Sequence, residues 1–196
     1  KKLLSIYNNF FFVLANVCSV SIIRIEARRV NMINLYIDFD GVIMNTIEIT
    51  YKILKQKGID LKDYNSCKRF YQQLNWAKVL KNSSAINDSW GCIARIINSQ
   101  KFNVAILTHV NSLAEIEEKV KVIRQHFRDI TIIPVPKSIS KTEMLKAEGA
   151  VLVDDYVHNL KEWEAAGGYG IRFDLDMDGK GYPVIDRLDV LVDMLD

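Results

Sequence analysis

The sequence has few of the residues that build disulfide frameworks, zinc clusters or long linkers. Its 196 residues include three cysteines, three prolines and nine glycines. The cysteines, Cys18, Cys67 and Cys92, are odd in number and follow no metal-ligand spacing, a usage typical of a reducing cytoplasm. The scarcity of proline and glycine leaves no long linker, and the length suits one domain with a substantial core.

An excess of charge of either sign is also absent. The 26 Lys and Arg residues nearly balance the 24 Asp and Glu residues, which leaves a formal net charge of +2. The basic residues are spread along the expected helices, so the sequence predicts no surface for a nucleic-acid polymer. An apolar run of the roughly 20 residues that a membrane span needs is missing as well.

Residues 1–31 do not fit the pattern of the rest. Lys1-Lys2 stand before the apolar run Phe10–Ala15, as in a signal peptide or signal anchor, although asparagines interrupt the stretch. An additional helix is a second interpretation. The third, which we favour, is that translation starts at Met32 and that residues 1–31 are read from upstream DNA. Arg28-Arg29 is compatible with the codons AGG-AGG, a ribosome-binding sequence. N-terminal sequencing of the native protein distinguishes these interpretations.

The most informative segment is Asp38–Val42, with the sequence Asp-Phe-Asp-Gly-Val, which follows the apolar run Leu35–Ile37. Carboxylates are costly to bury at a strand end unless they are paired or bound to a metal. The carboxyl end of a parallel strand is, however, the usual ligand position in α/β sheets. One carboxylate can attack a substrate, the other can transfer a proton, and a hard cation can hold their oxygens. An ordinary Asp-Gly turn is the alternative.

Further polar residues follow two later apolar segments. One segment ends in Thr108-His109, where a hydroxyl can donate to a phosphoryl oxygen, and another ends in Asp154-Asp155. Adjacent carboxylates repel each other and favour a site with a cation. Between these two segments of the chain, Ser140–Glu143 has the pattern of a helix start with a capping box. Lys141 stands in that first turn, where it can reach an anion at the strand ends.

Acid pair, hydroxyl, lysine and second acid pair, in this order within residues 34–173, resemble the haloacid dehalogenase (HAD) superfamily of phosphohydrolases. The resemblance implies that Asp38 is the nucleophile, which forms an aspartyl-phosphate, and that Asp40 is the general acid and base. It implies further that Thr108 binds the phosphoryl group and that Lys141 balances its charge.

The cofactor that the resemblance implies is Mg²⁺. Asp155 would be a metal ligand, together with the Asp38 carboxylate and the backbone carbonyl of Asp40. Asp154 would support the metal through water or a second contact. The choice between Asp154 and Asp155 as the direct ligand stays open, and we favour Asp155 because family members with Gly-Asp there carry the ligand at the second position.

Two further assignments stay open at this point. Lys137 also lies before the last acid pair and competes with Lys141 for the phosphate-binding role. We favour Lys141, because a helix start fixes a side chain better than a loop does. His109 either orients the substrate or makes a structural contact.

Strands that alternate with helices predict a doubly wound parallel α/β sheet of the Rossmann-like type, with the first strand at its centre. Residues 44–99 are expected to form a small helical insertion, which the resemblance interprets as a cap on the domain 32–196. Within it, Asp63–Lys81 has apolar residues at helical spacing. A helix over Val184–Leu195 is expected to close the chain. The candidate specificity residues of the cap are Tyr64, Phe70, Tyr71, Trp76 and Trp90.

Together these observations predict a cytoplasmic, Mg²⁺-dependent phosphomonoester hydrolase. The cap position and the two acid pairs are similar to the 5'(3')-deoxyribonucleotidase branch, which implies a nucleoside monophosphate as substrate. Another small phosphoester, such as a sugar phosphate, is the alternative. A catalytically silent binding protein, a phosphoprotein phosphatase and a phosphotransferase are the competing classes. The expected partner is a small phosphorylated molecule, with no membrane if residues 1–31 are artefactual, and the sequence gives no oligomeric state.

Overall fold

The structure is a computed structural model that describes residues 32–195. The interpretations of residues 1–31 therefore lie outside the described part of the chain. Among the described residues, the helices are too short or too polar to cross a bilayer.

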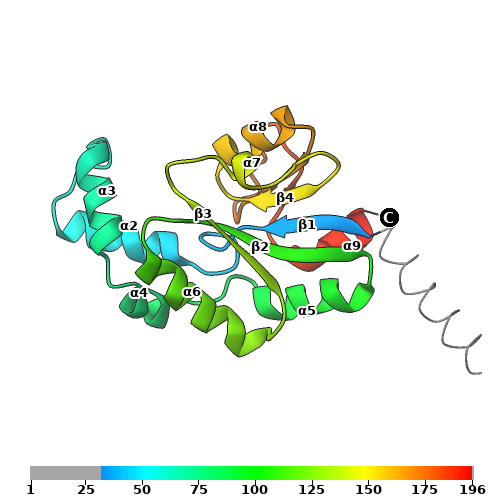
Figure 1. Cartoon of the computed structure of the whole chain (residues 1–196), viewed down its shortest axis with the longest axis horizontal. Helices are drawn as coiled ribbons and strands as arrows, with labels where there is room; N and C mark the ends of the chain where they lie inside the picture. Colours follow the sequence, from blue (N-terminus) through cyan, green and yellow to red (C-terminus); the bar gives the residue numbers. More distant parts are fainter. Residues whose placement is uncertain (1–31, 196) are drawn as a thin grey trace, which may run out of the picture. The chain divides into compact units, whose positions relative to one another are not determined.

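Six parallel strands form one sheet, in the order β3-β2-β1-β4-β5-β6 (Figure 1). The strands are β1 (Ile33–Ile37), β2 (Phe102–Val110), β3 (Thr131–Pro136), β4 (Val151–Asp154), β5 (Tyr169–Phe173) and β6 (Val184–Ile185). This arrangement confirms the predicted α/β fold with a parallel sheet, and β1 lies in the interior of that sheet.

Helices cover both faces of the sheet, with α5, α6 and α9 on one side and α7 and α8 on the other (Figure 1). The helices are α2 (Thr46–Gln56), α3 (Tyr64–Gln73), α4 (Trp76–Asn82), α5 (Ser89–Ser99), α6 (Leu113–His126), α7 (Lys141–Met144), α8 (Val157–Ala165) and α9 (Leu191–Met194), with a 3₁₀ turn at Leu188–Val190.

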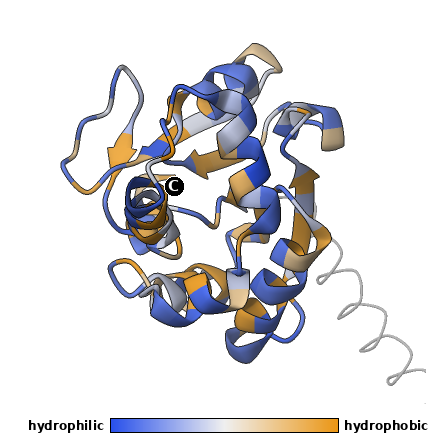
Figure 2. Cartoon of the chain, turned by 90° about the vertical axis from the view of Figure 1, so that its left-hand side faces the viewer, coloured by the Kyte–Doolittle hydropathy of each residue, from blue (hydrophilic) through white to orange (hydrophobic). Residues whose placement is uncertain are grey.

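The two faces of β1 supply side chains to two separate cores. Leu35 and Ile37 are fully buried in the core beneath α5 and α9, whereas Tyr36 points to the core around α8. The ring of Tyr36 meets Trp163 edge-on, with 5.4 Å between the centroids. This alternation follows from the two-residue period of a strand. Because both faces are covered, the strands are predominantly apolar, as the colours of Figure 2 show.

The insertion between β1 and β2 contains one helix more than expected. Asp63–Lys81 was predicted as a continuous helix, but it is divided into α3 and α4. Leu74 is extended, with ψ of 138°, and the side chain of Asn75 accepts a hydrogen bond from the backbone N–H of Lys78 at 2.9 Å. An asparagine that caps a helix competes with continuation of the preceding one.

The closing helix predicted over Val184–Leu195 is wrong in its first four residues. Val184 and Ile185 form β6, which pairs with Arg172 and Phe173 of β5. β-branched residues after a proline favour an extended strand over a helix. Helical structure begins only at Leu188.

The register of the central strands brings their carboxyl ends to one edge. Ile37 of β1 pairs with Ile106 of β2 and with Val153 of β4. The residues that follow these three strands therefore lie side by side. Figure 1 shows α2 and α3 beyond this edge of the sheet.

We predict that Asn75→Ala lowers the free energy of unfolding by about 1 kcal/mol, because one backbone N–H of α4 loses its partner. Urea unfolding followed by circular dichroism measures the change. Asn65→Ala is the matched control, because Asn65 is an exposed asparagine within α3 rather than the cap residue. Equal effects of the two substitutions would show that Asn75 is not the residue that starts α4.

Candidate active site

The turn after β1 is shaped so that a second carboxylate can lie against it. Gly41 has φ of +77°, a conformation that favours glycine. A Cβ atom on Gly41 would be 2.4 Å from Oδ2 of Asp155. The missing side chain of Gly41 therefore leaves the space in which the Asp155 carboxylate lies.

Lys141 joins the two acid pairs. Its ammonium group is buried and lies 2.7 Å from Oδ1 of Asp38 and 2.6 Å from Oδ2 of Asp154. Burial acts to lower the pKa of Lys141, but the charges of Asp154 and Asp38 outweigh it and raise the pKa. At the start of α7, the backbone N–H of Ser140 donates to Oε1 of Glu143 at 2.8 Å, as in the expected capping box.

Lys137 occupies a different position from Lys141. Its side chain is exposed, and its ammonium group lies 5.7 Å from the ring centroid of Tyr156. The geometry therefore favours Lys141 over Lys137 as the lysine beside Asp38.

The two carboxylates after β4 have different surroundings. Asp154 is fully buried, and its oxygens accept hydrogen bonds from Lys141, the Tyr156 N–H and the side-chain amide of Asn159 at 2.6–3.0 Å. Asp155 instead lines a cavity beside Asp38. Burial raises the pKa of Asp155 to about 8, and the negative charges of Asp154 and Asp38 contribute to the shift. This contrast favours Asp155 as the ligand that is available to a cation.

The acid cluster fits a divalent cation. Oxygen atoms of Asp38, Asp154 and Asp155 all lie within 4.8 Å of one another. Burial raises the pKa of Asp38 to about 6, against the opposing charge of Lys141 and with the help of the neighbouring carboxylates. A cation would relieve this crowding, and carboxylate oxygens are the ligands that Mg²⁺ prefers.

A second buried lysine, which the sequence analysis missed, contacts Asp40. Lys119 of α6 is fully buried, and its ammonium group lies 2.5 Å from Oδ2 of Asp40 and 2.8 Å from Oε1 of Glu115. It also donates to Oγ1 of Thr108 and to the carbonyl of His109, both at 3.0 Å. Lys119 thus connects the predicted acid–base residue with the predicted phosphate-binding hydroxyl.

The surroundings of Lys119 keep it charged. Burial acts to lower its pKa, but the charges of Asp40 and Glu115 outweigh this and raise the pKa. The ammonium group also lies 5.4 Å from the ring centroid of Phe39 and 5.2 Å from that of Trp76.

Glu115 and Asp40 are each fixed by a further contact. Oε2 of Glu115 accepts hydrogen bonds from the backbone N–H of Asn111 at 2.7 Å and from its side-chain amide at 3.1 Å. On the other side, Thr46 donates to Oδ1 of Asp40 at 2.6 Å. Both oxygens of Asp40 are therefore held by the protein.

The signal for Lys119 was present in the helical period. Glu115, Lys119 and Ile123 are four residues apart and are the buried residues of α6. A Glu–Lys pair at this spacing is usually a solvated pair on a helix surface. Here the apolar residue Ile123 lies on the same face of the helix, four residues after Lys119, and this distinguishes the pair from a solvated one.

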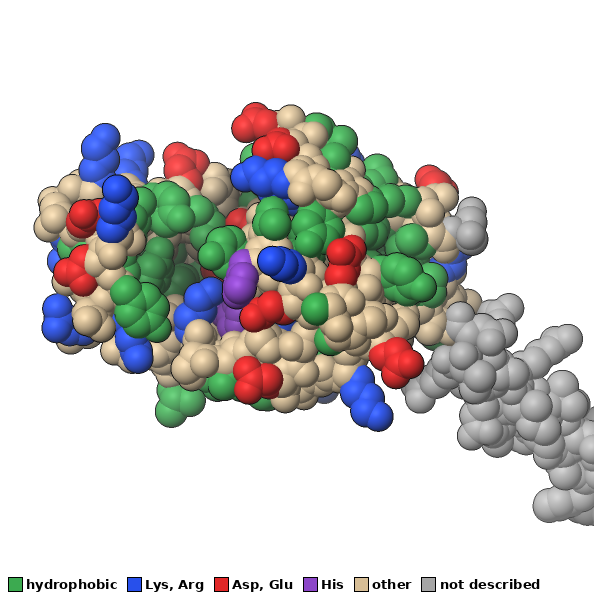
Figure 3. Space-filling view, turned by 90° about the horizontal axis from the view of Figure 1, so that it is seen from above, with side chains coloured by type: hydrophobic (Ala, Val, Ile, Leu, Met, Phe, Trp, Pro, Cys, Tyr) green, Lys and Arg blue, Asp and Glu red, His purple; other side chains and the backbone are tan. Residues whose placement is uncertain are grey.

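A cavity of about 340 Å³ opens beside the carboxylates. The candidate residues Asp38, Asp40 and Asp155 line one part of it. Side chains of the insertion and of the loop after β4 line the rest. Tyr51, Tyr71, Trp76 and Tyr156 contribute rings to it. In Figure 3 this face is hollowed between the helical insertion on the left and the remainder, with a histidine beside the hollow.

The five aromatic candidates of the insertion separate into different sites. Tyr71 and Trp76 line the cavity beside Asp38, and the other three do not. Phe70 lines a different cavity, Tyr64 is exposed, and Trp90 stacks on His126 with 4.3 Å between the ring centroids.

His109 lines the cavity beside Asp38 and is held by the loop before α7. Its Nε2 lies 3.1 Å from the carbonyl of Ile139. Burial lowers the pKa of His109 to about 4, and the charges of Lys137 and Lys141 act in the same direction. The imidazole is therefore neutral at neutral pH and can serve as a hydrogen-bonding group.

His109 predicts a pH dependence of stability. Unfolding returns its pKa from about 4 to the ordinary 6.5, so the unfolded state binds more protons below pH 6.5. The stability contributed by neutral His109 is complete above pH 6.5 and is lost as the pH falls towards 4.

Without this histidine, less stability should be lost at low pH. We expect His109→Gln to reduce the drop in the free energy of unfolding by about 1–2 kcal/mol, a modest value because the side chain is partly exposed. Urea unfolding at pH 7 and at pH 4.5 measures it as a difference between variant and wild type. His158→Gln, at an exposed position of α8, is the matched control, and His109→Gln should change the dependence more than it does. A His109→Gln protein with the same pH dependence as wild type would contradict the assignment of a lowered pKa.

No family model and no curated protein matches the chain. Solved structures do match it. The HAD-hydrolase YfnB from Bacillus subtilis, bound to magnesium, has a TM-score of 0.56 at 14% identity and covers 85% of this chain and 99% of its own. A conserved HAD-like protein of unknown function from Agrobacterium tumefaciens has a TM-score of 0.55 at 14% identity. The match covers 84% of this chain and 97% of that protein.

A third structure, the D,D-heptose 1,7-bisphosphate phosphatase from Burkholderia thailandensis, has a TM-score of 0.51 at 17% identity. The match covers 83% of this chain and 98% of that protein. At such low identities the likeness establishes the fold. The chain has the Rossmann-like α/β fold that is found in structures of HAD-superfamily hydrolases.

Proposed function

We propose that the protein is a Mg²⁺-dependent phosphomonoester hydrolase that works through an aspartyl-phosphate at Asp38. The observation that carries the proposal is the double pairing at the end of β1, where Lys141 contacts Asp38 and Lys119 contacts Asp40. This gives the two neighbouring carboxylates separate surroundings. The fold shared with a phosphatase and with a magnesium-bound hydrolase supports the proposal.

In the first step Asp38 attacks phosphorus. Oδ1 of Asp38 accepts a hydrogen bond from Lys141, which leaves Oδ2 to form the new bond. The bond between phosphorus and the ester oxygen breaks, and Asp40 delivers a proton to that oxygen as it leaves. Thr46 and Lys119 hold the Asp40 carboxyl group in place for this transfer.

In the second step the aspartyl-phosphate is hydrolysed. Asp40, which has given up its proton, takes one from a water molecule, and the oxygen of that water attacks phosphorus. The bond between phosphorus and Asp38 breaks, which restores the carboxylate and releases inorganic phosphate. Both steps use the same pair of carboxylates with their roles reversed: Asp38 is first the attacking group and then the leaving group, and Asp40 first gives a proton and then takes one.

Asp38, Asp155 and the backbone carbonyl of Asp40 would hold Mg²⁺, with Asp154 as a supporting residue. When bound, the ion offsets the negative charge of the phosphoryl group and of the carboxylates around it. Lys141 contributes a fixed positive charge at the same place. Thr108 is fully buried, with its hydroxyl 3.0 Å from the ammonium group of Lys119, and the proposal gives this hydroxyl the role of donating to a phosphoryl oxygen.

For the substrate we propose a small phosphorylated molecule and, as the first candidate, a nucleoside monophosphate. The rings of Tyr51, Tyr71 and Tyr156 around a cavity of about 340 Å³ favour a leaving group that carries a ring. Neutral His109 can accept or donate a hydrogen bond to it. A sugar phosphate is the alternative, and a cytoplasmic location belongs to the same proposal.

We expect Asp38→Asn to abolish phosphate release and leave the fold intact, because it removes the nucleophile but keeps the shape. The measurement is phosphate release from nucleoside monophosphates, sugar phosphates and p-nitrophenyl phosphate, with and without Mg²⁺, on protein that starts at Met32. Near-wild-type turnover by Asp38→Asn would refute the covalent mechanism. Folded wild-type protein that releases phosphate from none of these compounds would favour the silent binding protein.

We expect Lys119→Met to affect alkyl phosphates more than aryl phosphates. Without Lys119 the Asp40 carboxyl loses one of its two fixed contacts, and proton delivery fails most for leaving groups that need a proton. We predict a loss in kcat/KM of about 10²-fold or more for an alkyl phosphate, within the usual contribution of general acid catalysis. For p-nitrophenyl phosphate, the aryl phosphate of this comparison, the loss in kcat/KM should be smaller by a factor of roughly ten or more.

Lys121→Met is the matched control for this comparison, because Lys121 lies on the same helix with an exposed side chain that pairs with Glu118. It should leave both rates unchanged. Equal losses for the two substrates in Lys119→Met would show that Lys119 acts on the fold rather than on proton transfer by Asp40.

A further inference from the structure

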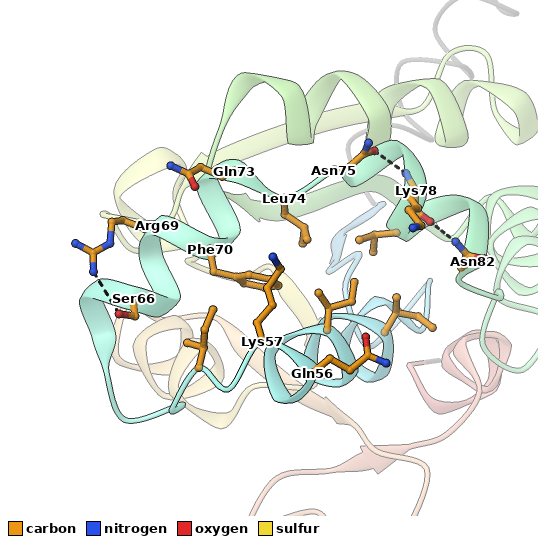
Figure 4. A pocket seen from close by; sticks show the side chains of 14 residues that line it. Gln56, Lys57, Ser66, Arg69, Phe70, Gln73, Leu74, Asn75, Lys78 and Asn82 are labelled. Atoms are coloured by element: carbon orange, nitrogen blue, oxygen red, sulfur yellow. Dashed lines mark hydrogen bonds between the residues drawn. The ribbon is translucent and has the colours of Figure 1, made fainter.

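A second cavity lies within the helical insertion, apart from the catalytic one. It has a volume of about 840 Å³, opens to solvent, and is lined by residues of α2, α3, α4 and the loop between α2 and α3 (Figure 4). The two cavities share no lining residue. Volumes of 300–1,000 Å³ are typical of sites for small molecules.

The walls of this cavity combine apolar side chains with polar and charged ones. Its apolar residues include Ile49 and Ile53 of α2, Phe70 of α3 and Val79 of α4. Figure 4 shows the ring of Phe70 and the side chain of Leu74 directed into the space between the helices. An apolar molecule would therefore bury its surface against three helices at once.

The charged side chains at this cavity all have one sign. Lys57, Arg69 and Lys78 line it, and no Asp or Glu does. Among the described residues, none of these three forms an ion pair with a carboxylate. Arg69 donates to the hydroxyl of Ser66 at 3.3 Å, and in Figure 4 the Lys57 side chain extends over the cavity. Apolar side chains with unpaired cations beside them complement a molecule that has an apolar body and an acidic group.

The wall between the two cavities is a single layer of helices. Ile49 lines the second cavity and Thr50 the catalytic one, and the same holds for Phe70 and Tyr71 of α3. The rings of Phe70 and Tyr71 meet edge-on, with 5.1 Å between their centroids. A ligand in the second cavity would thus pack against the back of the catalytic cavity.

We propose that the second cavity is a binding site for a small amphipathic anion, a molecule with an apolar body and one acidic group that is separate from the phosphoester substrate. A small molecule fits better than a protein partner, because a volume of about 840 Å³ is the size of a small-molecule site, whereas a stable protein interface needs a broad surface. The proposal does not depend on the proposed function.

The test uses 8-anilinonaphthalene-1-sulfonate, which has an aromatic body and one sulfonate, as a fluorescent probe on protein that starts at Met32. We expect saturable binding to one site. Lys57→Glu should weaken it at least tenfold, because a carboxylate then faces the sulfonate. Lys55→Glu changes the net charge equally at an exposed position of α2 outside the cavity, and it should bind as wild type does. Equal affinities of the two variants would overturn the proposal.

Two further variants keep the proposal open to refutation if Lys57→Glu fails to fold. Arg69→Glu should weaken binding of the probe. Lys68→Glu is its control, because Lys68 is exposed and does not line the cavity. Ile53→Trp should abolish binding by filling the cavity, and undiminished binding would overturn the assignment.

Asp38→Asn should bind the probe as wild type does, and inorganic phosphate with Mg²⁺ should not displace it. Displacement by phosphate would place the probe at the catalytic cavity and overturn the proposal. A dimer in analytical ultracentrifugation that Lys57→Glu dissociates would assign the cavity to a second copy of the chain instead. Because binding is measured without turnover, failure of this site and failure of the proposed function are distinguishable.

Discussion

The pairing of buried charges at one edge of the sheet is the interaction on which the candidate site depends. Two buried ammonium groups, of Lys141 and Lys119, each lie between two carboxylates. A buried lysine without such partners would lose its charge, and buried carboxylates without lysines would take up protons. Asp155 adds a carboxyl group that neither lysine pairs with, and burial and the neighbouring carboxylates raise its pKa to about 8. A divalent cation would offset this repulsion and favour the ionised form of Asp155.

The parallel sheet makes this pairing possible from two directions. Lys141 comes from α7 on one face of the sheet, and Lys119 comes from α6 on the other (Figure 1). Between them, β1 ends in Asp38 and Asp40, whose contacts separate accordingly, with Lys141 at the first and Lys119 at the second. One strand end can therefore present two carboxylates with different tasks, an attacking group and a proton carrier.

The sequence was sufficient to predict the parallel sheet and the residues that directly follow its strands, because apolar runs ending in Asp or Thr are contiguous signals. Lys119 could not be found this way, since its burial depends on how α6 packs against Phe39 and Trp76. The break before Asn75 was missed because the apolar spacing continues across it. The separation of Phe70 from Tyr71 into two cavities likewise depends on the packing of α3 between them.

Trp76 has a consequence beyond the lining of a cavity. It is the first residue of α4, and its indole lies 5.2 Å from the ammonium group of Lys119. The insertion thereby supplies part of the dielectric environment of the sheet edge, because an indole ring occupies space that water would otherwise fill. The strength of the electrostatic attraction between Lys119 and Asp40 is thus coupled to how closely α4 is seated.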